Sequence, residues 1–130
     1  MASVPVCELP LGPVIPVSDI DCSRRFYEKQ LGFVGNYAPG GYALRGGDHN
    51  VLFLLTGTSY PGQAEWPLAS FRTDDLAATV AELNARGVAL EQIHDDFAQT
   101  DARGIAQMEG MLIAWVRDPD DQVLSFFQLT

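Results

Sequence analysis

The sequence predicts an α+β fold in which one order of elements, a strand, a helix and three strands, occurs twice along 130 residues. Two observations support this prediction. A β-branched run, an Asp and an amphipathic helix follow one another in each half, and the two copies lie roughly 55 residues apart. Each predicted helix ends at a glycine, and turn-forming Gly, Pro and Asp residues separate the apolar runs after it. We therefore interpret the chain as one domain made of two βαβββ modules.

The first module is predicted over about residues 11–57. Asp19 or Asp21 supplies the N-cap of its helix, and Gly32 permits the left-handed turn that ends the helix. The predicted strands are the runs rich in β-branched and aromatic residues at 13–17, 33–37, 42–45 and 51–56, with turns at 39–41 and 46–48 between the last three.

The second module is predicted over about residues 67–130, after a linker over about 57–66. Asp74 or Asp75 caps its helix, whose apolar residues recur at i, i+4 and i+7, and Gly87 ends it. The predicted strands cover residues 68–72, 88–93, 111–116 and 122–129. The stretch 95–110 is predicted to be a long irregular loop that covers a site.

Composition argues against several classes of function. A net charge of −9 would repel the phosphates of nucleic acids, and no stripe of Lys and Arg offsets it. The apolar runs are too short to cross a bilayer, and the N-terminus shows no secretion signal, so a cytoplasmic location is expected. Cys7 and Cys22 lack the spacing of a zinc knuckle and are expected to be reduced thiols.

Three stretches together resemble a known family. They are "PVIPVSDIDCSRRFYEKQLGF", "FRTDDLAATVAELNARGV" and "WVRDPDDQVLSFFQL". In this order and spacing they resemble the vicinal-oxygen-chelate superfamily, which includes glyoxalase, bleomycin-resistance and extradiol dioxygenase proteins. The resemblance implies that the two modules form curved mixed sheets around a cleft, within a homodimer. The stretch "SVPVCELPLGPVIPV" resembles the N-terminal strand that bleomycin-resistance proteins exchange between subunits.

In metal-dependent members of this superfamily, four His, Gln or Glu ligands bind a divalent ion on the first and last strands of the modules. Matching by motif gives Gly12 in module one, seven residues before the candidate cap Asp19, and the corresponding position Leu68 in module two. The last strands of the modules offer Leu54 and Ser125. None of the four positions carries a strong metal ligand, and shifting each by one residue supplies none. His49 and His94 are expected in a turn and a loop. We therefore predict no metal and no cofactor.

With these positions fixing the inward face, the period-two alternation of strands predicts an apolar and aromatic ligand site. The predicted ligand-binding residues are Tyr42, Leu44, Leu52, Leu54, Trp66, Leu68, Met111, Ile113, Trp115, Ser125 and Phe127, with Tyr37, Phe97 and Met108 in or beside loops at the opening. Ordinary packing in the core or the loops is the alternative for many of them, including Leu52 and Ile113.

The sequence thus favours a dimeric protein that binds a small aromatic ligand without altering it. The resemblance suggests sequestration of a bleomycin-, mitomycin-, enediyne- or quinoxaline-like drug. The alternative is a metal-independent enzyme, such as a lyase, isomerase or cyclase, with Glu65, Glu109 or Asp101 as general base. A structural or regulatory subunit is a third possibility. Binding ranks first because no pair of titratable residues falls at inward strand positions, so no catalytic residue is predicted.

Overall fold

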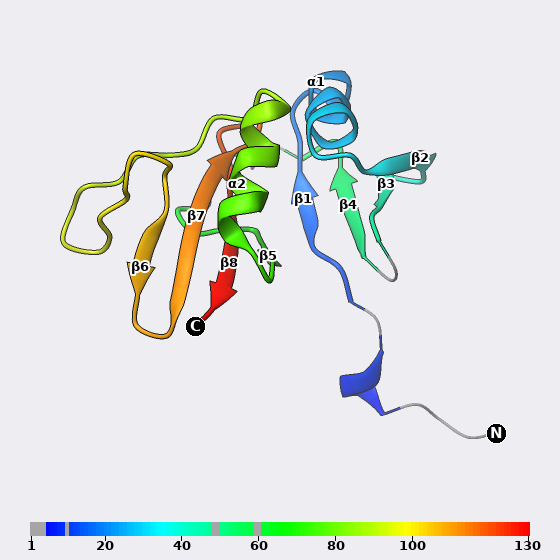
Figure 1. Ribbon diagram of the computed structural model, residues 1–130. Coiled ribbons are helices and arrows are strands. Elements are labelled where there is room, and N and C mark those ends of the chain that lie inside the picture. Colours follow the sequence, from blue (N-terminus) through cyan, green and yellow to red (C-terminus); the bar gives the residue numbers. More distant parts are fainter. Residues whose placement is uncertain (1–4, 10, 48–49, 59–60) are drawn as a thin grey trace.

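Two four-stranded mixed sheets, each with a helical segment packed on it, make up the structure, which is a computed structural model (Figure 1). It describes residues 5–9, 11–47, 50–58 and 61–130. Parts of four predicted features lie outside these ranges: His49, residue 48 of the second turn, residues 59–60 of the linker, and residues 3, 4 and 10 of the N-terminal stretch. The order of elements is βαβββ twice, which confirms the predicted α+β fold of two modules.

Module one forms the sheet with strand order β1-β4-β3-β2, in which β1 is parallel to β4 and the other neighbours are antiparallel. It contains β1 (Val14–Pro16), α1 (Ile20–Arg24), the π-helical segment η2 (Arg25–Gln30), β2 (Val34–Ala38), β3 (Gly41–Arg45) and β4 (Val51–Leu55). Asp19 is the N-cap, since its carboxylate accepts hydrogen bonds from the backbone of Asp21 and Cys22. Gly32, with φ of 86°, ends the helical stretch as predicted.

Module two repeats this arrangement with strand order β5-β8-β7-β6. It contains β5 (Ala69–Arg72), α2 (Leu76–Ala85), β6 (Ala106–Met108), β7 (Met111–Arg117) and β8 (Val123–Leu129). Of the two candidate caps of its helix, Asp75 accepts a hydrogen bond from the backbone of Ala78. Gly87 follows with φ of 80°, where the sequence predicted the stop.

The prediction of a strand over residues 88–93 is wrong. That stretch makes a single β-bridge, between Leu90 and Val116, and β6 at Ala106–Met108 is the outer strand of the sheet instead. Both segments lie along the same edge of β7, β6 beside its first residues and Leu90 near its end. The loop between them occupies part of the predicted 95–110 region, which also contains β6.

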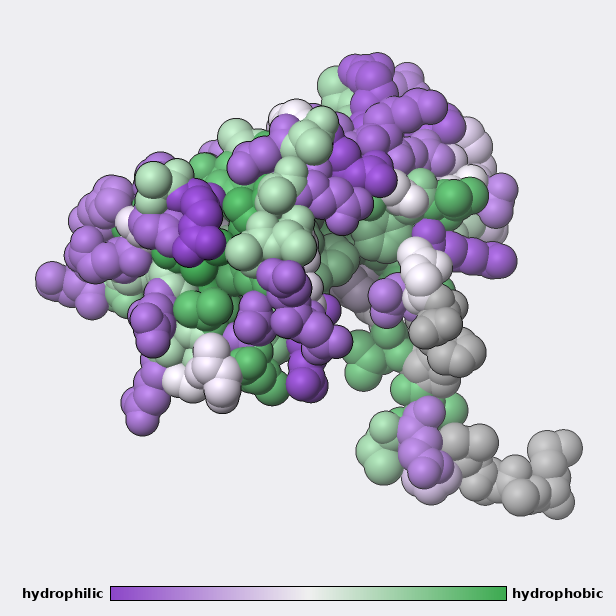
Figure 2. All heavy atoms as spheres, viewed as in Figure 1, coloured by the Kyte–Doolittle hydropathy of each residue, from purple (hydrophilic) through white to green (hydrophobic). Residues whose placement is uncertain are grey.

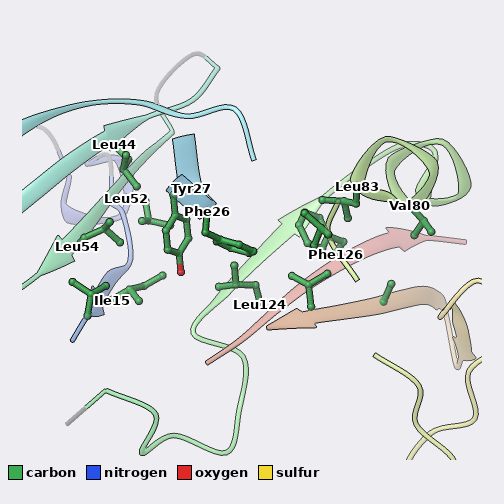
Figure 3. Close-up of a cluster of buried hydrophobic side chains, with 14 of the residues drawn as sticks. Ile15, Phe26, Tyr27, Leu44, Leu52, Leu54, Val80, Leu83, Leu124 and Phe126 are labelled. Carbon is green, nitrogen blue, oxygen red and sulfur yellow. The ribbon is translucent and has the colours of Figure 1, made fainter. Parts of the chain in front are cut away.

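One apolar core joins the two modules (Figure 3). Phe26 and Tyr27 lie between the residues of sheet one, such as Leu54, and those of sheet two, such as Leu124. Their rings meet edge to face at 5.0 Å. The π-helical turn places these consecutive residues together in the core, both less than 10% exposed. Burial of this core, to which both helices and both sheets contribute side chains, stabilises the contact between the modules.

A polar junction reinforces the contact between the modules. The buried carboxylate of Asp118 accepts hydrogen bonds from Tyr27 at 2.8 Å and from the backbone and side chain of Gln122 at 2.9 Å. The side chain of Gln122 also donates to the carbonyl of Pro16 at 2.8 Å. Burial, together with the charge of Asp118, raises the pKa of Tyr27, which therefore keeps its proton. The end of β1 is thus fixed to the start of β8.

An N-terminal arm extends away from both sheets and contains a short 3-10 turn, η1 (Val6–Glu8) (Figure 1). Val6, Leu9 and Leu11 on it are exposed. Figure 2 shows hydrophobic residues on this arm and below the helices, while hydrophilic residues cover much of the upper surface. Among the described residues, no helix has both the length and the apolar character needed to cross a membrane.

Candidate functional site

A groove runs between the modules where β1 and β5, the outer strands of their sheets, face each other without pairing. We call it the intermodule groove. Its volume is about 610 Å³, which is within the range of small-molecule sites in proteins. Its lining consists of Leu11, Gly12, Pro13, Phe33, Asn50, Val51, Leu52, Leu68, Ala69, Ser70, Phe71 and Arg72.

The polar junction marks one end of this groove. The carbonyl of Pro16, at the end of β1, accepts a hydrogen bond from the side chain of Gln122. The backbone N–H of Leu68, the residue before β5, donates to the carbonyl of Val123, which follows Gln122 in the chain. Strand β1 therefore runs toward the junction and β5 runs away from it. Gly12 and Arg72 consequently lie at the ends farthest from the junction, at 3.2–3.4 Å per extended residue. The polar junction therefore lies at one end of the groove, and Gly12 and Arg72 lie toward the other.

Aromatic rings form much of the apolar wall. The ring centroids of Phe33 and Phe71 are 6.2 Å apart, and Phe71 stacks on Phe126 at 4.7 Å and 13°. Phe33 and Phe71, with Asn50, also line a second hollow of about 260 Å³ on the helix side. Phe33 lies just before β2, and Phe71 belongs to the outer strand β5. The period-two alternation of strand residues did not assign Phe33 or Phe71 to the site.

The superfamily's metal positions have no suitable donors here. A Cβ at Gly12 would lie 2.1 Å from the carbonyl oxygen of Val51, so no ligating side chain fits there. The hydroxyl of Ser125 is bonded to that of Ser70 at 2.8 Å, and Leu54 lies in the core. Within the described ranges, no three His, Cys, Asp or Glu side chains cluster as a metal site would require. These residues do not fit a divalent ion.

The residues predicted to face the cleft from sheet one lie in the apolar core. Tyr42, Leu44, Leu52 and Leu54 point toward the helical side, where each is at most 2% exposed. Leu52 also borders the groove. Tyr37 lies across from Tyr42 on the neighbouring strand, and the guanidinium of Arg24 contacts both rings at 5.2 and 4.6 Å. The opposite, open face of this sheet carries Val14, Val51, Phe53 and Leu55.

In sheet two the predicted residues lie on the face opposite α2. Ile113, Trp115, Met111, Met108 and Phe127 belong to a second apolar cluster there. Ala98, in the loop between Leu90 and β6, packs into the same cluster, and the ring centroid of the neighbouring Phe97 lies 6.4 Å from that of Trp115. The loop therefore covers Trp115, which is 5% exposed. Ser125 is buried on this face beside the groove residue Ser70.

The two other predicted residues are on the approach to β5. Leu68 lines the intermodule groove. Trp66, two residues earlier, is 64% exposed. The structure thus brings Leu68, Leu52 and, through Ser70, Ser125 to the groove, and gathers most of the others into two apolar clusters.

None of the three candidate general bases lines the groove as the structure describes it. Glu65 and Glu109 are exposed. Asp101 accepts hydrogen bonds from the side chain and backbone of Arg103 and from the backbone of Ile105, which together lower its pKa. Its ion pair with Arg103, at 2.8 Å, fixes the turn before β6. These contacts give the Asp101 carboxylate a structural role in the turn before β6.

Comparison with known proteins identifies the family to which this fold belongs. The chain matches the Glyoxalase/Bleomycin resistance protein/Dioxygenase superfamily over residues 11–126. No curated protein matches it. Among solved structures it is similar to UcmS2, with 16% identity, a TM-score of 0.69 and coverage of 89% of this chain and 94% of the other.

Two further structures share the fold. One is TnmS3, an antibiotic binding protein from Streptomyces sp. CB03234, with 23% identity, a TM-score of 0.62, and 95% and 98% coverage of this chain and that one. The other is virulence protein STM3117 from Salmonella typhimurium, with 26% identity, a TM-score of 0.60, and 90% and 93% coverage. The chain belongs to the Glyoxalase/Bleomycin resistance protein/Dioxygenase superfamily.

Proposed function

We propose that this chain is a metal-independent binding protein that sequesters an aromatic natural product in the intermodule groove. The groove supports this most directly. It has the volume of a small-molecule site and is lined by Phe33, Phe71 and aliphatic side chains. It also includes Gly12 and Leu68, two positions at which metal-dependent members carry ligands, and neither residue has a donor side chain.

Aromatic walls favour a flat ligand. Stacked or edge-to-face rings contribute about 0.5–1.5 kcal/mol each beyond the burial of apolar area. A protein of this kind acts by mass action, since it lowers the free ligand concentration and releases the ligand unchanged. The structural similarity to TnmS3, which is described as an antibiotic binding protein, is consistent with an antibiotic as the ligand.

We further propose that the protein acts as a homodimer. The face of sheet one opposite its helix carries exposed apolar residues, among them Val14 at 58% and Val51 at 45%. The arm carries Leu11 at 89%. A second copy that receives the arm would bury these surfaces and enclose the groove.

Calorimetric titration with bleomycin, mitomycin C, an enediyne chromophore and a quinoxaline antibiotic tests the binding proposal. At least one compound should bind at micromolar concentration or below. It should also change the emission of Trp66, which is exposed two residues before the groove residue Leu68. Trp115 is buried elsewhere, so Trp66→Phe should remove most of the fluorescence change.

Two variants locate the site. Ser70→Phe fills the groove and should weaken binding at least tenfold, while Asn84→Phe, on the exposed surface of α2, should leave it unchanged. Ligand extracted after incubation should be chemically intact. Silent titrations across the whole panel, or equal binding by both variants, would refute sequestration in this groove. Recovery of a modified product would show an enzyme instead.

A further inference from the structure

Among the described residues that line the intermodule groove, Arg72 is the one with a cationic side chain. Four of the six other arginines form ion pairs with carboxylates: Arg24, Arg86, Arg103 and Arg117. Arg25 donates to the sulfur of Cys22, and Arg45, like Arg72, has no ion pair among the described residues, but neither of them lines the groove. The side chain of Arg72 makes no hydrogen bond or ion pair in the part of the chain that the structure describes. In a chain with 17 acidic and 8 basic residues, potential partners for an arginine are abundant. The five donors of this side chain are therefore available to a ligand.

Arg72 lies at the edge of the groove, on the same strand as the lining residue Ser70. In the strand pairing, Arg72 lies opposite Phe127 and Ser70 lies opposite Ser125. Because side chains two residues apart share a face, Arg72 and Ser70 project on the same side of β5. Arg72 stands toward the end away from the junction, and the Ser70–Ser125 hydroxyl pair is one step nearer the junction. A ligand along β5 would meet an apolar wall, a hydroxyl and then a guanidinium.

From this arrangement we infer that the groove selects aromatic ligands that carry an anionic oxygen group, such as a carboxylate or a sulfonate. This inference rests on the proposed function and names the ligand class for the same site. A guanidinium binds a carboxylate through two parallel hydrogen bonds, and low local dielectric in an apolar groove strengthens that contact. The net charge of −9 would repel an anion at long range, so a preference for anions would have to arise locally.

A pair of fluorescent dyes with the same ring system tests the inference. One is 8-anilinonaphthalene-1-sulfonate, and the other is its uncharged counterpart N-phenyl-1-naphthylamine. The sulfonate should bind the full-length protein roughly tenfold more tightly than the neutral dye, as expected for a charge-assisted contact. Arg72→Gln should abolish this difference, so that the two dyes bind the variant with similar affinity. Lys29→Gln, which removes an exposed helical cation, changes the net charge equally and should keep the difference.

Since both dyes are compared within each variant, a change in stability alters both affinities and not their ratio. Ser70→Phe should weaken both dyes, which locates them in the groove. Equal affinities of the wild-type protein for the two dyes would overturn the inference and leave the proposed binding function standing. So would equal losses of sulfonate binding in Arg72→Gln and Lys29→Gln. Failure of both dyes to bind would also overturn the inference, while the titrations with the antibiotic panel decide the proposed function.

Discussion

At the scale of single residues, Asp118 shows how a short polar motif can determine the arrangement of a whole molecule. The motif "VRDPDD" was part of the family resemblance, and its role here is structural. The Asp118 carboxylate accepts hydrogen bonds from the backbone of Asp120 and Gln122, which closes the turn before β8. The same carboxylate accepts the Tyr27 hydroxyl from module one. One side chain therefore both forms a turn and joins the modules.

We expect Asp118→Ala to lower the free energy of unfolding by about 3 kcal/mol or more, because buried donors, among them the Tyr27 hydroxyl, would lose their acceptor. Tyr27→Phe, which removes one of those bonds, should cost less, about 1.5 kcal/mol. Chemical denaturation of both variants measures these values. Asp96→Ala, at an exposed loop position, is the control and should stay within about 0.5 kcal/mol of the wild type. An equally small effect of Asp118→Ala would contradict this account of the junction.

At the scale of elements, helix starts and stops were readable from the sequence because they depend on local chemistry. Asp19, Asp75, Gly32 and Gly87 act through hydrogen bonds to nearby backbone or through their own φ. Strand faces were harder to predict. A shift of one residue turns every side chain of a strand to the other face. In the run Val51–Leu55 all residues are apolar, so composition cannot distinguish the core face from the open one.

The outer strand of sheet two illustrates the same limit. Residues 88–93 have the apolar content of a strand, yet Ala106–Met108 pairs with β7 over more of its length. Competition for one strand edge is a tertiary effect that local propensity does not contain. The predicted residues Leu52 and Leu68 line the groove, but Phe71 and Arg72 were missed for a related reason. Phe71 and Arg72 lie on a strand edge that faces the other module, and no single-strand pattern records that edge.

The N-cap of α1 gives a prediction with a defined pH dependence. Hydrogen bonds from the backbone and thiol of Cys22 lower the pKa of Asp19 below its ordinary value of 3.8. Asp19→Ala should therefore lower Tm by about 3–6 °C at neutral pH. A carboxylate with a lowered pKa in the folded state stabilises the fold above the unfolded pKa, and the effect disappears as pH falls through the folded pKa. The Tm difference from the wild type should shrink below about pH 4.

Asp21→Ala is the matched control for the cap, because Asp21 was the other candidate and its side chain accepts no capping bond. Its effect on Tm at neutral pH should be clearly smaller. Thermal melts followed by circular dichroism between pH 2.5 and 7 compare the three proteins. A Tm difference for Asp19→Ala that stays constant across this range would exclude the ionised carboxylate as its cause.

At the scale of the whole molecule, the repeat in the sequence correctly indicated two modules, and their contact explains where a site can form. The modules share a core beneath the helices and a polar junction at Asp118, while their sheets do not pair along β1 and β5. This arrangement leaves a groove between rigid elements. The open sheet face beside it and the arm carry apolar residues at high exposure, such as Val14 and Leu11. Exposed apolar side chains of this kind are the observation on which the proposed dimer rests.

The proposed dimer should therefore appear in sedimentation as a species of twice the 14.2 kDa chain mass at micromolar concentration. Val14→Asp and Leu55→Asp place a charge on the open face of sheet one and should shift the protein toward the monomer, because an unpaired charge is costly to bury between subunits. Ala81→Asp, at an exposed position of α2, adds the same charge to the helical side and should leave the dimer intact.

A wild-type protein that sediments as a monomer at every concentration would refute the dimer. Equal dissociation of all three variants would instead point to general charge repulsion, since the chain already carries −9, and would remove the open sheet face as the interface.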